Sequence, residues 1–265
     1  MDVAKLKEQA RVSWGKGDYS GLSQMLAPAA TALADACAVS AGQEVLDVAA
    51  GDGNFALAAA AEGASVTASD LAPGMVEAGR ARSEAEGFDI DWLEADAEAL
   101  PFEDRSFDCV GSVFGAMLAP RPRVMAEELF RVVRPGGTVG MTVWTDSGPT
   151  YDMFAIGRSY APPSDAPRLE EWSQEDVVRE RFDGLAGSLQ IEPASLPWAA
   201  DSPEDFVAGM ERHAPQQVAA KEAMPPDLYA ELRERMLALA RDWAGGDGPF
   251  EIQAEYVLIV ARRPG

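Results

Sequence analysis

Metal-binding and disulfide-forming residues are scarce in this chain of 265 residues. It contains two cysteines, Cys37 and Cys109, far apart in the sequence, and a single histidine, His213. Cys109 lies within the apolar stretch FDCVGSV, where a cysteine usually serves as a small hydrophobic residue of a buried strand. The spacing of these residues fits neither a disulfide framework nor a metal site. We therefore expect no bound metal.

Basic residues and long apolar runs are also few. The chain has 22 Lys and Arg against 44 Asp and Glu, a formal charge of −22, and most of its basic residues are Arg. A charge of this sign repels phosphate backbones, which argues against nucleic acid as a partner. No stretch approaches about 18 uncharged apolar residues, and residues 1–14 lack the apolar core of a signal peptide. We expect a cytoplasmic protein without a membrane segment.

Short apolar strands alternate with helices from residue 43 onward. The expected strands are 44–49, 65–70, 89–93, 107–113 and 138–145, and the helices between them lie near 54–62, 74–86 and 121–133. Each strand ends at a turn residue. Such alternation predicts an α/β fold with a parallel sheet covered by helices on both faces and a binding site at the carboxyl ends of the strands.

The two ends of the chain depart from this alternation. Before it we expect helices over 2–14 and 20–38, the second with Asp18 or Ser20 as its N-cap and kinked or split by Pro28. The segments expected after it are a helix over 150–160, a helix that opens at SQEDVVRERF with Ser173 starting a capping box, strands over 188–196 and 251–263, and a helix over 226–243. About fifty residues separate the last two strands, far more than a hairpin needs.

Together these segments predict a doubly wound, Rossmann-like, mainly parallel seven-stranded sheet. Residues 1–40 would form an N-terminal helical cap, and residues 41–265 would form the main domain. A helical lid, inserted at about 199–247 before the last strand, would cover the carboxyl edge of the sheet.

The stretch VLDVAAGDGN reads as a strand, a glycine turn and the start of a helix. Gly51, Gly53 and Ala56 satisfy the G-x-G-x-x-A pattern of dinucleotide sites. Asp47 within the strand and Asp52 between the glycines would repel a pyrophosphate at this turn. The same carboxylates favour S-adenosylmethionine (SAM), which carries a sulfonium and an ammonium group.

Two more carboxylates follow strands of the same sheet. Asp70 ends the strand SVTASD, where it can accept both ribose hydroxyls of either cofactor. Asp96 follows the third strand in Ala95-Asp96-Ala97, a suitable place to accept the adenine amino group. With Asp47, three carboxylates thus fall at the ends of three successive strands.

Four motifs together resemble the class I SAM-dependent methyltransferases, in the group similar to the quinone-biosynthesis C-methyltransferases. They are VLDVAAGDGN, VTASDLAPGMVEAGRAR, ADAEALPFEDRSFDCV and AEELFRVVRPGGTVGMTVW, in the family's order, over residues 43–145. WGKGDYSGL is similar to the family's N-terminal helix that folds over the cofactor. RVVRPGG itself predicts only a helix end and a turn into the fifth strand.

The resemblance implies a set of cofactor contacts. The backbone around Ala49, Gly51 and Gly53 would hold the methionine moiety, with Asp47 near its ammonium. The other implied contacts are Asp70 at the ribose, Leu71 and Met75 against the nucleoside, Asp96 and Ala97 at adenine, Ser112 and Phe114 at the methionine end, and Tyr19 closing over it. Ala49 stands where the family commonly has glycine, and we expect an ordinary backbone conformation there.

The resemblance implies in-line methyl transfer to a small molecule. Aromatic residues and methionines after the fifth strand favour a largely apolar or aromatic acceptor. His213, in the expected lid, could act as a general base, with Glu211 and Tyr160 as weaker alternatives, or could be a surface residue. The alternatives are a protein methyltransferase, a repurposed SAM-binding protein and an NAD(P)-dependent oxidoreductase. A homodimer is possible.

Overall fold

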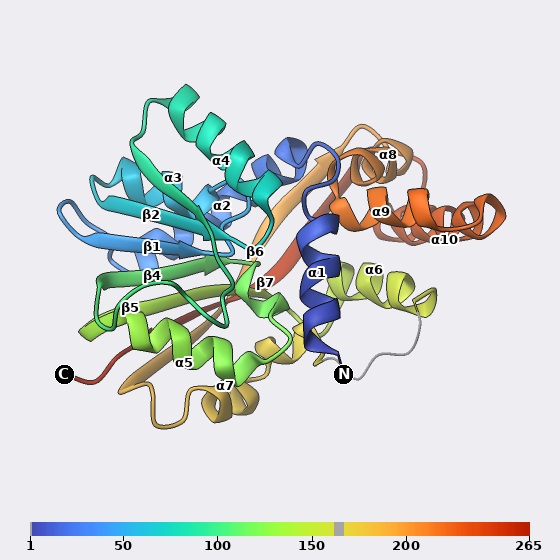
Figure 1. Ribbon diagram of the computed structural model, residues 1–265. Coiled ribbons are helices and arrows are strands. Elements are labelled where there is room, and N and C mark those ends of the chain that lie inside the picture. Colours follow the sequence, from blue (N-terminus) through green and yellow to red (C-terminus); the bar gives the residue numbers. More distant parts are fainter. Residues whose placement is uncertain (1, 162–166) are drawn as a thin grey trace.

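The computed structural model describes residues 2–161 and 167–265 of the chain. A seven-stranded sheet runs through its centre in the order β3-β2-β1-β4-β5-β7-β6 (Figure 1). The strands are β1 Glu44–Val48, β2 Ser65–Asp70, β3 Ile90–Glu94, β4 Phe107–Val113, β5 Val133–Trp144, β6 Ser188–Ala200 and β7 Phe250–Arg262. The first five are parallel and β7 is antiparallel to both its neighbours. The predicted seven-stranded, mainly parallel sheet is confirmed.

Helices lie on both faces of the sheet and beyond one edge. They are α1 Val3–Ser13, α2 Ser20–Ala36, α3 Asn54–Ala61, α4 Pro73–Glu86, α5 Pro122–Val132, α6 Gly148–Ser159, α7 Glu175–Arg181, α8 Pro203–His213, α9 Pro215–Ala223 and α10 Pro226–Ala244, with 3-10 helices η1 Ala116–Leu118 and η2 Leu169–Ser173. In Figure 1, α2, α3 and α4 lie on one face and α5 and α7 on the other. The sheet is therefore doubly wound.

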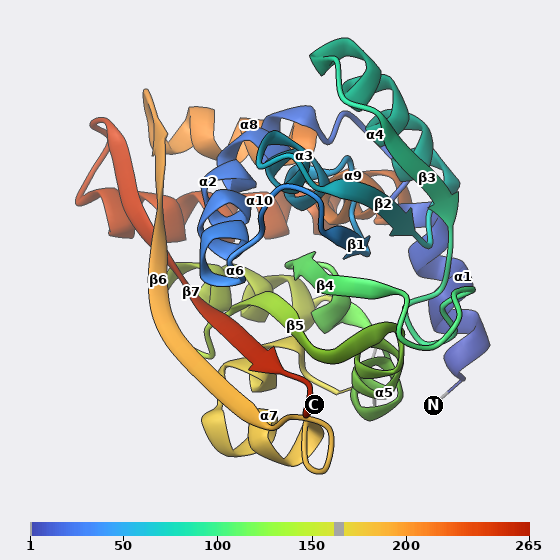
Figure 2. The same ribbon diagram turned by 90° about the vertical axis from the view of Figure 1, so that its left-hand side faces the viewer.

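Two apolar clusters fill the space between sheet and helices. The first joins α2 and α3 to strands β1 to β4, with Phe55 and Leu33 fully buried. The second joins β4, β5, β6 and β7 to α5, η2 and the helices between β6 and β7. In Figure 2 the long strands β6 and β7 run beside β5 at the far side of the sheet from β3.

The insertion before the last strand consists of α8, α9 and α10. In Figure 1 these helices gather with α6 beyond one edge of the sheet, beside α1. The N-terminal segment contacts them: Lys16 pairs with Glu222 of α9, and a Cβ on Gly17 would lie 2.9 Å from Val218. The N-terminal segment and α9 are thus in direct contact.

Three local expectations are wrong. The N-cap of α2 is Tyr19 rather than Asp18 or Ser20, although the Asp18 carboxylate accepts the Ser20 N–H at 3.1 Å; the helix also runs past Pro28 without being split. Ser173 does not cap α7: it ends η2, and its hydroxyl donates to the Glu170 carbonyl. β5 begins at residue 133 rather than 138, because the backbone of Arg263 pairs with Gly136 and Gly137.

Candidate functional site

The glycine turn after β1 has a left-handed backbone at three positions. Ala49 has φ 53°, Gly51 58° and Gly53 95°. The expectation of an ordinary backbone at Ala49 is therefore wrong. The loop after β4 passes so close that a Cβ on Gly115 would lie 2.2 Å from the Ala49 carbonyl oxygen. An alanine in this conformation costs on the order of 1–2 kcal/mol, a strain typical of binding sites.

Asp47 lies beneath this turn. It is 1% exposed, and its Oδ2 accepts the Ala56 N–H at 2.9 Å, at the start of α3. Its Oδ1 is buried and has no hydrogen-bond partner among the described residues. Burial, with the Asp70 and Asp52 carboxylates nearby, raises the pKa of Asp47 well above its ordinary value. A buried carboxylate oxygen without a partner fits a ligand that brings a cation.

Asp70 joins the ends of β1 and β2. Its Oδ2 accepts the Gly51 N–H and its Oδ1 accepts the Ala72 N–H, each at 2.8 Å. Burial raises the pKa of Asp70 to about 6. The carboxylate is therefore held at the turn itself, close to Asp47.

Asp52 has a partner of its own. Its carboxylate accepts the Ser23 hydroxyl at 2.5 Å and lies 3.2 Å from Arg82 on α4. Burial raises the pKa of Asp52, and Ser23 and Arg82 partly oppose that rise. Arg82 thus offsets the Asp52 charge, and the acidity that faces a ligand comes from Asp47 and Asp70.

The third carboxylate lies beside the end of β3. The Ala95 N–H donates to the Asp70 carbonyl at 2.9 Å. Asp96, the next residue, therefore lies close to the Asp70 backbone. Asp96 Oδ1 accepts the Glu98 N–H at 2.9 Å, while its Oδ2 lies 2.6 Å from Lys7 Nζ of α1. The structure thus brings Asp47, Asp70 and Asp96 to one edge of the sheet.

The remaining predicted contacts lie around these carboxylates. Met75 is buried, and Leu71 and Ala97 are half-buried. Ser112, at the end of β4, accepts the Ala116 N–H at 2.9 Å. The Tyr19 ring lies over the turn, 3.4 Å from where a Cβ on Gly51 would stand, and burial raises the pKa of its hydroxyl.

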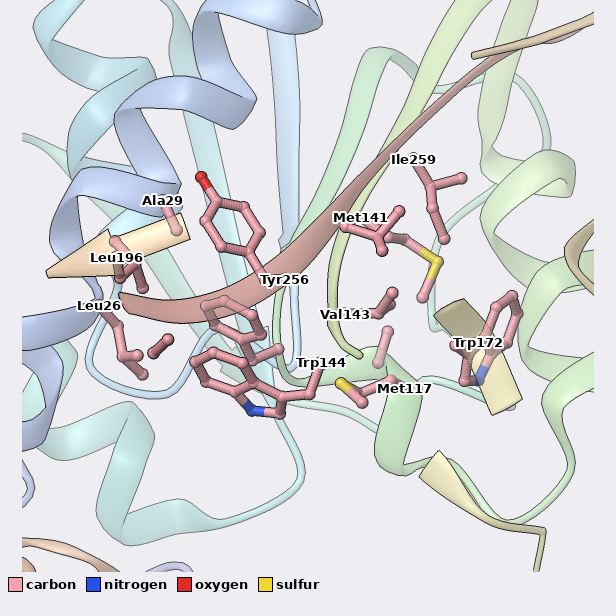
Figure 3. Packing of buried hydrophobic residues seen from close by; sticks show 14 of the residues in the cluster. Leu26, Ala29, Met117, Met141, Val143, Trp144, Trp172, Leu196, Tyr256 and Ile259 are labelled. Atoms are coloured by element: carbon pink, nitrogen blue, oxygen red, sulfur yellow. The ribbon is translucent and has the colours of Figure 1, made fainter. Parts of the chain in front are cut away.

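Phe114 follows Ser112 and Val113 with a left-handed backbone, φ 56°. Its ring stacks on Trp144 at the end of β5, with centroids 3.8 Å apart and planes 8° apart. Tyr256 of β7 meets Phe114 edge-on at 5.6 Å. Figure 3 shows Trp144 and Tyr256 side by side, with Trp172 in a separate part of the cluster. Phe114, Trp144 and Tyr256 therefore form one aromatic group, and Trp172 lies apart from it.

The three candidate bases lie in or beside the lid and already have partners. His213 Nδ1 lies 2.8 Å from the Asp18 carbonyl oxygen, and its ring packs against Gly21. Glu211 accepts the Tyr229 hydroxyl at 2.8 Å. Tyr160 donates to Glu231 at 2.8 Å. The role of His213 as general base stays a prediction.

Two residues of this edge were missed by sequence reasoning. Gly115 lies outside the glycine motif, and its close approach to Ala49 comes from strand order. Lys7 pairs with Asp96 across 89 positions of sequence. No local pattern marks either residue.

Two negative observations apply to the described part of the chain. No group of three or more His, Cys, Asp and Glu side chains there could hold a metal ion. None of its helices is long and apolar enough to cross a membrane.

Comparisons with known proteins place these features in a family. Residues 45–137 match the family model described as "Methyltransferase domain". An uncharacterized protein of Mycobacterium tuberculosis is 36% identical over 264 residues, covering 96% of this chain and 93% of that protein. A demethylmenaquinone methyltransferase of Clavibacter sepedonicus is 44% identical over 99 residues, 37% of this chain and 40% of that protein.

Solved structures share the fold. The YcgJ protein of Bacillus subtilis has a TM-score of 0.59 at 21% identity, over 89% of this chain and 99% of that one. A phosphoethanolamine N-methyltransferase of Haemonchus contortus, solved with SAM, has a TM-score of 0.55 at 20% identity, over 90% of this chain and 53% of that one. With the family match and the buried acidic edge, these findings show that the chain belongs to the class I SAM-dependent methyltransferases, similar to the quinone methyltransferases.

Proposed function

We propose that this enzyme methylates a small, largely apolar metabolite that binds between the ends of β4 and β5 and the lid. The observation that carries the proposal is the aromatic group Phe114, Trp144 and Tyr256. Phe114 directly precedes Gly115, which touches Ala49 of the cofactor turn. Through Gly115, this aromatic group lies next to the proposed cofactor turn, and aromatic rings there suit an apolar acceptor.

The lid extends this apolar surface. Trp198 of β6 meets Trp144 edge-on at 5.7 Å and Phe206 of α8 at 5.9 Å. A cavity of about 20 Å³ lies among the lid helices and α6, lined by apolar side chains and by Glu211, Tyr229 and Arg233. Met153, Met210 and Met236 also line it, and methionine side chains adapt readily to different shapes. We expect this region to rearrange when an acceptor binds.

The cofactor contacts implied by the family resemblance are part of the proposal. The backbone at Ala49, Gly51 and Gly53 would hold the methionine moiety over Asp47. Asp70 would accept the ribose hydroxyls in place of its present backbone donors. Around them, the proposed contacts are Asp96 and Ala97 at adenine, Leu71 and Met75 against the nucleoside, and Ser112, Phe114 and Tyr19 at the methionine end.

When bound, SAM supplies a methyl group that is already activated on a sulfonium. The protein then has to align the acceptor with that methyl group and keep water out, and orientation alone can contribute about 7–11 kcal/mol. Tyr19 above the turn and the buried aromatic group would perform these two tasks. An acceptor hydroxyl would also need a base, for which His213 stays the candidate.

Polar metabolites and proteins are alternative acceptors, and the methyl-transfer assay described below distinguishes them from apolar ones. The charge of −22 supports a small molecule over nucleic acid. We also propose that the enzyme works in the cytoplasm, and a homodimer stays possible.

Transfer of labelled methyl from SAM to a panel of acceptors tests the proposal. The apolar arm contains a reduced naphthoquinone, a phenol and an indole, and the polar arm contains phosphoethanolamine and a carboxylic acid. We expect turnover in the apolar arm, lost in Phe114→Ala but retained in Val12→Ala, whose side chain is exposed on α1. Turnover confined to the polar arm, or to protein substrates, would refute the proposed acceptor class.

A further inference from the structure

The N-terminal segment crosses the carboxyl ends of three strands in order. Lys7 and Arg11 contact the end of β3, and Gly15 lies against Gly74, where a Cβ would be 3.2 Å from the Gly15 Cα. Tyr19 then lies over Gly51 after β1. These points are where the proposed adenine, ribose and methionine contacts begin. The segment therefore lies over the carboxyl ends at which the cofactor is proposed to bind.

No residue of α1 is fully buried, although Val3, Leu6 and Ala10 are half-buried. Ion pairs also connect this helix to the end of β3 and the loop after it. Lys7 Nζ lies 2.6 Å from Asp96 Oδ2 and also pairs with Glu98, whose side chain is fully buried. Arg11 donates to both oxygens of Glu94, from Nε at 2.8 Å and from Nη2 at 3.0 Å.

The distribution of lysines along the chain also indicates that charge attaches the N-terminal segment to the rest of the protein. The chain has four lysines, and Lys5, Lys7 and Lys16 all precede residue 20. Lys7 and Lys16 each pair with a carboxylate of another element, Lys16 with Glu222 of α9. In a protein of net charge −22, a cationic segment across a carboxylate-lined edge is attracted by the whole edge.

We propose that Lys7 and Arg11 form a charge clasp that closes α1 over the adenine end of the site and sets the rate of cofactor exchange. This inference rests on the proposed cofactor contacts. Lys7 and Arg11 are positioning residues: they act through Asp96 and Glu94 and through the placement of α1. Since screening by salt weakens such pairs once they begin to open, cofactor exchange should accelerate as salt increases.

Lys5 provides a matched control. It lies on the same helix and carries the same charge, but its side chain is exposed and no ion pair is recorded for it among the described residues. Lys7→Gln and Lys5→Gln therefore change the net charge equally, and only the first removes ion pairs of the clasp, those of Lys7 with Asp96 and Glu98. Lys7→Arg keeps the charge and should restore much of the wild-type behaviour.

The first measurement needs no ligand. Hydrogen exchange of the α1 amides, residues 3–13, is followed in ligand-free protein. Lys7→Gln and added salt should both accelerate it, and Lys5→Gln should leave it near the wild-type rate. Equal exchange in the two variants would overturn the clasp, whether or not the protein binds SAM.

The second measurement follows the release of bound S-adenosylhomocysteine (SAH) in a chase experiment, at about 50 mM and about 500 mM NaCl. Release from Lys7→Gln at low salt should be at least about fivefold faster than from Lys5→Gln, with a smaller response to salt. Equal release rates would refute control of exchange by the clasp. A wild-type protein that binds no SAH would instead refute the proposed cofactor site, while hydrogen exchange still decides on the clasp.

Discussion

The proposed cofactor edge and the proposed acceptor side of this methyltransferase are built from different side chains. At the ends of β1 and β2, buried carboxylates accept backbone N–H groups around a strained turn, as with Asp47 and Asp70. At the ends of β4, β5 and β7, aromatic rings contact one another, as with Phe114 and Trp144. In the first region, burial makes the charged carboxylates unfavourable, a cost that the proposed cationic cofactor would relieve. In the second, buried aromatic rings stabilise the fold and would form the proposed apolar wall.

This difference separates stability from binding. Burial raises the pKa values of Asp47 and Asp70, so their charged forms are unfavourable in the ligand-free protein. Trp144 is 7% exposed at the centre of the second apolar cluster, where its area stabilises the fold. Substitutions in the two regions should therefore act on different measurements.

The largest effect on stability is expected for Trp144→Ala. Losing this buried ring should lower the free energy of unfolding by about 3–5 kcal/mol. Trp14→Ala, on the half-buried cap segment, should cost much less. Urea denaturation measures both. Equal costs would mean that the aromatic group does not carry the stability we assign to it.

Asp70→Asn should act mainly on binding. Losing the carboxylate should weaken SAH binding about 100-fold, about 2.7 kcal/mol, because the ribose hydroxyls would lose one of two acceptor oxygens and the charge that strengthens both hydrogen bonds. Ligand-free stability should fall by less than about 3 kcal/mol, because the amide leaves one of the Gly51 and Ala72 N–H groups without an acceptor while a costly buried charge is removed. Glu62→Gln makes the same charge change at an exposed site at the end of α3 and should leave binding unaltered. Calorimetric titration distinguishes the two variants.

Gly115→Ala tests the contact that joins the two regions. The added methyl group would meet the Ala49 carbonyl oxygen at 2.2 Å, and relieving that overlap should cost about 1–3 kcal/mol of stability and weaken SAH binding. Gly157→Ala makes the same change inside α6, where a Cβ has open space, and should stabilise the protein slightly. A harmless Gly115→Ala would contradict the close approach.

The pH response is the smallest expected effect. The pKa of Asp70 is about 6 in the folded protein against 3.8 ordinarily, so ligand-free stability should fall as pH rises from about 4 to about 6 and then level off. SAH affinity should do the opposite, falling about tenfold between about pH 7.5 and about pH 5, because binding favours the ionised carboxylate. Asp70→Asn should flatten both curves, and an unchanged response in that variant would assign the effect to another group.

Sequence patterns predicted the sheet well because strand and helix periodicity is local. The strands at 65–70 and 107–113 agree with the structure to the residue. The expectation at Ala49 is wrong, and the close neighbour of this residue, Gly115, is 66 positions away and comes near only once β4 pairs with β1. The Lys7 pair was missed for the same reason. Motif reading found the carboxylates at the strand ends, and it could not show which ones folding would neutralise, as Arg82 does for Asp52.

The most direct test of the central claim is thermal stabilisation by SAM compared with NAD⁺. The account holds that the carboxylates at the ends of β1 and β2 suit a cationic methionine end and repel a diphosphate. SAM at about 100 times its dissociation constant should stabilise the wild-type protein by about 2.7 kcal/mol, and NAD⁺ at the same concentration should have no effect. Stabilisation by NAD⁺ without a response to SAM would contradict it.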